Sequence, residues 1–234
     1  MKLVINGDDL GYTKANTYGI FQAYTDGILR SATALVNAKY FEESIQKAQK
    51  EYPGLGIGVH LTLTLGKPLT NCPSLTDPEM GTFWKGRKAL FAQELDYNEV
   101  YTEFKAQIDR FIETAGRRPT HLDSHHSVHD MSPEALAVSK RLAEEYGLQL
   151  RRYSSYRFIR EFTGKDASVE KLIQLLEDNK DTDIEIMCHP GWCDLELFRE
   201  SSYSLGRVQE LAVLCDEEVI RYIHDRNIEL CHYE

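Results

Sequence analysis

The sequence predicts a single-domain α/β protein, built as a distorted, partial β/α barrel of about seven strands. The length is the first observation, because 234 residues suit one such barrel. The second is the alternation of short apolar segments with amphipathic helical segments, an order typical of parallel sheets. The third is that reactive residues follow several of the expected strands, as they do in β/α barrels. A doubly wound open sheet is the alternative.

The first third of the chain is expected to alternate between strands and helices. Thr13 can accept hydrogen bonds from the N–H groups that open a helix, and Gly27 can end that helix. A second helix carries apolar residues at helical spacing from Phe41 to Ala48. The expected strands are residues 3–5, 31–36 and 56–62.

Residues 64–96 are expected to form a long irregular loop insertion within the single domain 1–234. Gly and Pro residues interrupt this segment repeatedly, so no long helix or strand is expected there. An excursion of this length in a compact domain is usually a lid or a binding loop. Trp84 could stack on a substrate, although an aromatic side chain packed under its own loop is the more common arrangement.

The rest of the chain continues the alternation. Asp96 and Glu99 resemble a capping box that opens a helix ending at Gly116. Ser132 and Ser168 are expected to cap two further helices. The remaining expected elements are strands at 121–125, 148–151, 184–188 and 228–231, helical segments around 207–222, and an irregular stretch at 153–167.

The composition narrows the class of partner. The net charge of -10 and the pI near 5.3 argue against nucleic acid and anionic membranes, because no basic stretch compensates. The amino-terminal apolar run is too short for a signal peptide, and no transmembrane span is expected. Five cysteines without a C-x-x-C pair fit reduced thiols. These features predict a cytoplasmic protein, and a homodimer is the base-rate expectation for its assembly.

Four of the expected strands lead to candidate reactive residues at one end of the sheet. They deliver Asp8 with Asp9, His60, the histidine-rich stretch 120–129, and His189. A carboxylate and two imidazoles from separate strands can hold a catalytic divalent metal ion and leave room for water and substrate.

Within the stretch 120–129, a two-residue period would put His121, Asp123 and His125 on one face. One aspartate of the adjacent pair Asp8 and Asp9 could bind the metal, while the other accepts a proton as general base. His189 could protonate a departing nitrogen. A solvated polar loop and ordinary structural histidines are the alternatives.

Five motifs, taken in order, resemble those of the YdjC-like carbohydrate deacetylases, whose best-known members are chitooligosaccharide deacetylases. The motifs are residues 4–11, 33–37, 58–64, 118–126 and 189–191. The resemblance implies a distorted β/α barrel and one divalent metal ion, either magnesium or zinc. It also implies hydrolysis of the acetamide group in small N-acetylglucosamine-containing oligosaccharides derived from chitin, with phosphorylated chitobiose as a candidate substrate.

Carried over by position, the resemblance makes Asp9, His60 and His125 the metal ligands and Asp8 the general base. Ser127 departs from the family pattern, which more often has histidine there. The resemblance therefore does not assign the accessory substrate contacts at this position. The roles of three further histidines are not assigned by the resemblance, and these are His121, His126 and His129.

Two other functions are alternatives to deacetylation. A metal phosphoesterase could use the same metal-activated water, and a carboxylate-bridged pair of metals would favour it. A non-catalytic sugar-binding protein with a structural metal would lack an open coordination position. The second carboxylate beside Asp9 argues against a structural site, which gains nothing from a spare base.

Overall fold

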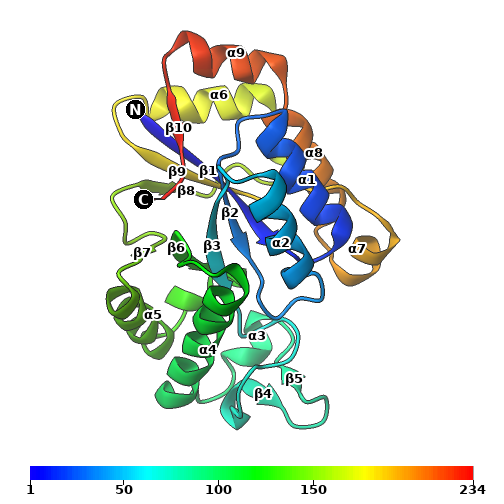
Figure 1. The fold of residues 1–234 in the computed structure, drawn as a ribbon, viewed down its shortest axis with the longest axis vertical. Coiled ribbons are helices and arrows are strands. Elements are labelled where there is room, and N and C mark those ends of the chain that lie inside the picture. The colour runs from blue at the N-terminus through cyan, green and yellow to red at the C-terminus, as the bar shows by residue number, and fades with distance from the viewer. Residues whose placement is uncertain (234) are drawn as a thin grey trace.

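The computed structural model describes residues 1–233, which form a curled parallel sheet surrounded by helices (Figure 1). The strand order is β7-β6-β3-β2-β1-β9-β8, with β10 paired to β1, and all these pairings are parallel. The predicted partial barrel is therefore confirmed. The strands are β1 (Lys2–Leu10), β2 (Ser31–Ala34), β3 (Gly56–Leu61), β6 (His121–Ser124), β7 (Gln149–Leu150), β8 (Arg157–Ile159), β9 (Ile184–Cys188) and β10 (Glu229–Cys231).

The predicted helix caps are formed. The side chain of Thr13 accepts a hydrogen bond from the N–H of Asn16, and Ser132 and Ser168 cap their helices in the same way. None of the described helices is both long enough and apolar enough to cross a membrane. The helices are α1 (Lys14–Thr25), α2 (Phe41–Glu51), α3 (Arg87–Leu90), α4 (Tyr97–Ala115), α5 (Pro133–Tyr146), α6 (Val169–Asp178), α7 (Leu195–Glu200), α8 (Leu205–Leu214) and α9 (Glu217–Asp225).

The sheet differs from the prediction at two strands. Strand β8 lies inside the stretch that was expected to be irregular, and it forms one end of the sheet order by pairing with β9. It has only three residues and begins with the exposed Arg157, so it lacks the apolar pattern that identifies a strand in a sequence. Strand β10 does form, but it lies off the main order, beside the first residues of β1.

The segment 64–96 is irregular, as predicted, but it is anchored to α4. The buried carboxylate of Glu103 accepts hydrogen bonds from the main-chain N–H groups of Leu69 and Thr70, at 3.0 and 2.9 Å. Its regular pieces are the 3-10 turn Pro73–Leu75, the two-residue strands β4 (Thr76–Asp77) and β5 (Thr82–Phe83), and α3.

One detail of this region corrects the sequence prediction, and a second decides between two arrangements that it left open. Asp96 caps α4, but the carboxylate of Glu99 does not complete a capping box, because it accepts a hydrogen bond from the N–H of Ser74 instead. Trp84 does not line the pocket described below; its indole N–H points to the carbonyl of Ser74 at 3.4 Å and its ring packs against the core. It therefore adopts the more common arrangement, under its own loop.

Candidate active site

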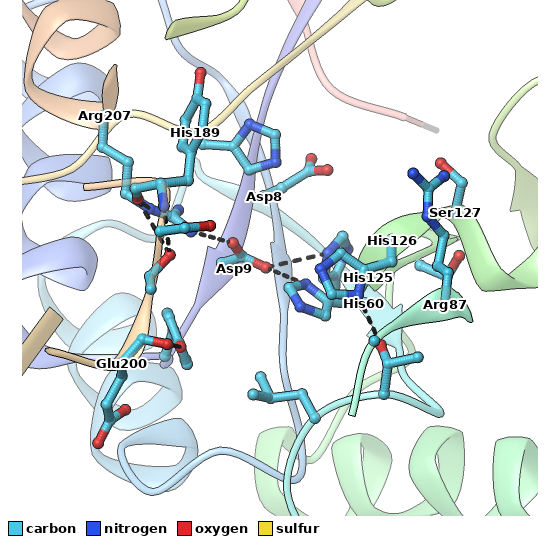
Figure 2. Close-up of a pocket in the computed structure, with 18 of the residues that line it drawn as sticks. Asp8, Asp9, His60, Arg87, His125, His126, Ser127, His189, Glu200 and Arg207 are labelled. Atoms are coloured by element: carbon cyan, nitrogen blue, oxygen red, sulfur yellow. Dashed lines mark hydrogen bonds and ion pairs between the residues drawn. The ribbon is translucent and has the colours of Figure 1, made fainter. Parts of the chain in front are cut away.

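A pocket of about 560 Å³ lies at the carboxyl ends of the central strands. The five residues that the sequence singled out all line it (Figure 2), and these are Asp8, Asp9, His60, His125 and His189. They come from the end of β1, the end of β3, the turn after β6 and the residue after β9. The topology thus brings together side chains that are far apart in the sequence, from Asp8 to His189.

Asp9 is the centre of the site and has an unusual backbone. Its φ angle is +71°, in the left-handed region that non-glycine residues rarely adopt, and it lies where the register of β1 with β2 shifts. Its Oδ1 atom is 2.9 Å from Nδ1 of His125 and 3.3 Å from Nε2 of His60. Its Oδ2 atom accepts a hydrogen bond of 2.7 Å from the guanidinium of Arg207.

The donor set of Asp9, His60 and His125 fits a divalent metal ion. Ligand atoms that each lie about 2.1 Å from one ion are about 3.0 to 3.4 Å apart at octahedral to tetrahedral angles. The separations of 2.9 and 3.3 Å at Asp9 Oδ1 are close to this range. All three ligand atoms lie within 4.8 Å of one another.

The imidazole of His60 is oriented from behind by a carboxylate. Its Nδ1 atom is 2.7 Å from Oδ1 of Asp123, which leaves Nε2 facing Asp9. Such a carboxylate–histidine pair is typical of metal-binding histidines. Burial alone would lower the pKa of His60, but Asp123, Asp9 and Asp8 outweigh it and raise the pKa to about 10. The surroundings of His60 therefore favour a positive charge.

Asp8 is held by a buried arginine that the sequence analysis did not find. Both oxygens of Asp8 accept hydrogen bonds of 2.8 Å from Arg151, and the amide of Asn6 donates to Oδ1 at 2.8 Å. Arg151 also pairs with Asp123 at 2.8 Å and with Glu185 at 2.7 Å. Burial would raise the pKa of Asp8, but Arg151 outweighs it and holds the pKa well below its usual range. Asp8 is therefore a carboxylate at neutral pH.

His189 follows β9 and faces the same pocket. Its main-chain N–H donates a hydrogen bond to the buried Glu210, and its ring lies 5.2 Å from the ring of Tyr203. Its Nδ1 atom is buried and has no hydrogen-bond partner among residues 1–233. The ring lies beside Asp8 (Figure 2), and no side chain of residues 1–233 bonds its Nδ1 atom.

The other histidines of the stretch 120–129 divide between the core and the pocket. His121 stacks on Tyr233 with ring centroids 4.0 Å apart, and burial lowers its pKa to about 3. His129 is also buried, and burial lowers its pKa to about 4. Neither lines the pocket, whereas His126 does. The strand expected to carry His121, Asp123 and His125 is shorter than predicted, because β6 ends at Ser124 and His125 begins a 3-10 turn.

Positive charge lines one side of the pocket. Lys85 and Arg87 come from the segment 64–96, are exposed, and have no ion pair within the described chain, residues 1–233. Figure 2 shows Arg87 beside Ser127, on the side of the pocket opposite Glu200. The pocket therefore offers unpaired cationic groups some distance from the cluster around Asp9.

The sequence model of the YdjC-like protein family matches residues 2–225. A carbohydrate deacetylase of Enterococcus faecalis is 39% identical, over 100% of this chain and 97% of the relative. One of Brevibacillus brevis is also 39% identical, over 98% and 97%. A crystal structure from Enterococcus faecalis, of a protein proposed to act in cellobiose-phosphate cleavage, matches with a TM-score of 0.92 and 38% identity, over 99% and 97% of the two chains.

Proposed function

The chain belongs to the YdjC-like protein family, and we propose that it is a metal-dependent N-deacetylase of small N-acetylglucosamine-containing oligosaccharides. The observation that carries the proposal is the meeting of five residues from four separate segments in one pocket, and these are Asp8, Asp9, His60, His125 and His189. The names of the relatives support acetyl removal from a carbohydrate. Chitooligosaccharides and phosphorylated chitobiose are the substrates we propose.

Each residue of the cluster has a role in this proposal. Asp9, His60 and His125 would hold the metal ion, which when bound polarises the acetamide carbonyl and makes water more acidic. Asp8 accepts the proton of the attacking water as general base. His189 donates a proton to the sugar nitrogen as the carbon–nitrogen bond breaks, so the products are acetate and a free amine. Arg207 holds the second oxygen of Asp9 in place.

One metal ion fits this site better than two. A second group of potential ligands exists, Asp8, His60 and Asp123, but the guanidinium of Arg151 already lies 2.8 Å from both of these carboxylates. A cation in that position disfavours the two-metal arrangement of many phosphoesterases. Two imidazoles among three ligands favour zinc over magnesium, which prefers oxygen ligands.

We expect purified protein to hold one divalent ion per chain. His60→Ala and His125→Ala should each reduce metal occupancy, because each removes one of three protein ligands. His224→Ala is the matched control, since this imidazole is 88% exposed and lies outside the pocket. Elemental analysis of the four proteins checks this expectation. Two ions per chain in the wild type, or equal losses in all three variants, would contradict the assignment.

The cationic side of the pocket supports a phosphorylated sugar as substrate. Arg87→Ala should raise the KM for a phosphorylated disaccharide by roughly tenfold, because a charge-assisted hydrogen bond contributes about 1.5 to 3 kcal/mol. The KM for the unphosphorylated disaccharide should change little. Lys88→Ala is the control, as this neighbouring cation does not line the pocket. Equal changes in KM for both substrates would remove the phosphate-binding role.

Acetate release tests the proposed reaction directly. Metal-loaded protein is incubated with diacetylchitobiose and with its phosphate ester, and acetate and free amine are measured. We expect both products in equal amounts, and none after chelation of the metal. Phosphate release without acetate would instead indicate a phosphoesterase, and binding without either product would indicate a sugar-binding protein.

A further inference from the structure

We propose that Glu210 is the positioning residue for His189. Its carboxylate holds the main-chain N–H of His189 and the hydroxyl of Tyr203, so that the Tyr203 ring braces the imidazole against the pocket. The inference rests on the proposed function, because it concerns the proton that His189 delivers to the departing nitrogen. Neither Glu210 nor Tyr203 is identified by any motif in the sequence.

Glu210 is a buried carboxylate whose partners are all neutral donors. It is 0% exposed, and it forms no ion pair with Lys or Arg within residues 1–233. Three groups donate hydrogen bonds to it: the N–H of Gly164 at 2.7 Å, the N–H of His189 and the hydroxyl of Tyr203. A buried charge is costly unless such bonds satisfy it. These three hydrogen bonds satisfy the buried carboxylate and tie Gly164, His189 and Tyr203 to helix α8.

His189 needs support from elsewhere because its Nδ1 atom has no hydrogen-bond partner among residues 1–233. Nucleophiles and proton-transfer groups are usually oriented by a third side chain. His60 has such a partner in Asp123, whereas Nδ1 of His189 has none among the described residues. What fixes His189 is its backbone, held by Glu210, and the Tyr203 ring, 5.2 Å away and inclined by 58°. Both supports donate a hydrogen bond to the same carboxylate.

Helix α8 connects this support to the metal side of the site. Arg207 and Glu210 are three residues apart, so they project from neighbouring positions on one side of the helix. Arg207 binds Asp9 at 2.7 Å, and Glu210 binds the loop that carries His189. One helix therefore sets the relative position of the proposed metal ligand and the proposed proton donor.

The test compares two substrates that differ in their need for a proton donor. An N-acetyl sugar has a poor leaving group and requires protonation, whereas 4-nitrophenyl acetate has a leaving group that departs unprotonated. In Glu210→Gln and in Tyr203→Phe, kcat for the sugar should fall by roughly tenfold to a hundredfold, the range expected for a misplaced catalytic group. Ester hydrolysis and metal content should stay within about twofold of the wild type, since mere destabilisation or metal loss would lower both reactions.

Tyr146→Phe is the matched control, because the Tyr146 hydroxyl also donates a hydrogen bond to a carboxylate, Asp109, but lies outside the pocket. It should leave both reactions unchanged. If Tyr203→Phe lowered kcat equally for the sugar and the ester, or lowered it for neither, the inference would be overturned. This holds even if Glu210→Gln failed to fold. If the wild type released no acetate from any acetamido sugar while it hydrolysed the ester, the proposed function would be wrong, and this inference with it.

Discussion

Asp8→Asn is expected to keep the fold and the metal ion and to lose acetate release by roughly a hundredfold to ten-thousandfold, the usual contribution of a general base. Asn nearly matches Asp in shape but cannot take up a proton as a base. Its side-chain oxygen can still accept a hydrogen bond from Arg151, which keeps its partners Asp123 and Glu185. The change therefore removes the general base, while Arg151 remains paired with its other two carboxylates.

The neighbouring aspartate provides the comparison for this prediction. Asp9→Asn should weaken metal affinity, because a neutral amide oxygen is a poorer ligand for a divalent ion. Its activity should partly recover at high metal concentration, whereas that of Asp8→Asn should not. Metal titration alongside acetate release measures both effects. Loss of the ion in Asp8→Asn and its retention in Asp9→Asn would reverse the two roles.

The ends of the strands could be predicted from the sequence because the relevant signals are local. Apolar runs, capping residues and glycines recur at spacings that specify an element, and parallel strands bring their carboxyl ends to one edge. This is why Asp8, Asp9, His60 and His189, which directly end or follow apolar runs, were expected near one another. Their meeting in one pocket depends on topology more than on side-chain detail.

The buried charges behind the site could not be predicted in the same way. Arg151, Arg207 and Glu210 are ordinary charged residues in the sequence, where nothing separates them from solvent-exposed ones. Glu185 carries a weak signal, since it lies between two isoleucines in a strand, and central strands of parallel sheets are buried on both faces. A carboxylate there needs a buried partner, but only the folded chain identifies that partner as Arg151.

The largest expected loss of stability follows from removing Arg151. This side chain pairs with three buried carboxylates, Asp8, Asp123 and Glu185, at 2.7 to 2.8 Å. Arg151→Met retains most of the volume, so the dominant change is that these carboxylates lose their shared cation. Breaking a buried ion pair by removing one partner costs about 3 to 5 kcal/mol, and we expect at least this loss in the free energy of unfolding.

Urea unfolding of the metal-free protein measures the loss, and the adjacent Arg152 provides the control. Arg152 makes one ion pair, with Asp130 at 2.8 Å, and its side chain is 33% exposed, so Arg152→Met should cost less than about 1 kcal/mol.

The difference in free energy of unfolding between the wild type and Arg151→Met should narrow as the pH falls toward about 4. In the wild type, the lowered pKa of Asp8 gives stability that is lost as acid protonates it. In the variant, burial without a cation raises the carboxylate pKa values, so protonation stabilises the fold. Equal losses for the two arginine variants, or a deficit that grows in acid, would show that Arg151 does not balance these charges.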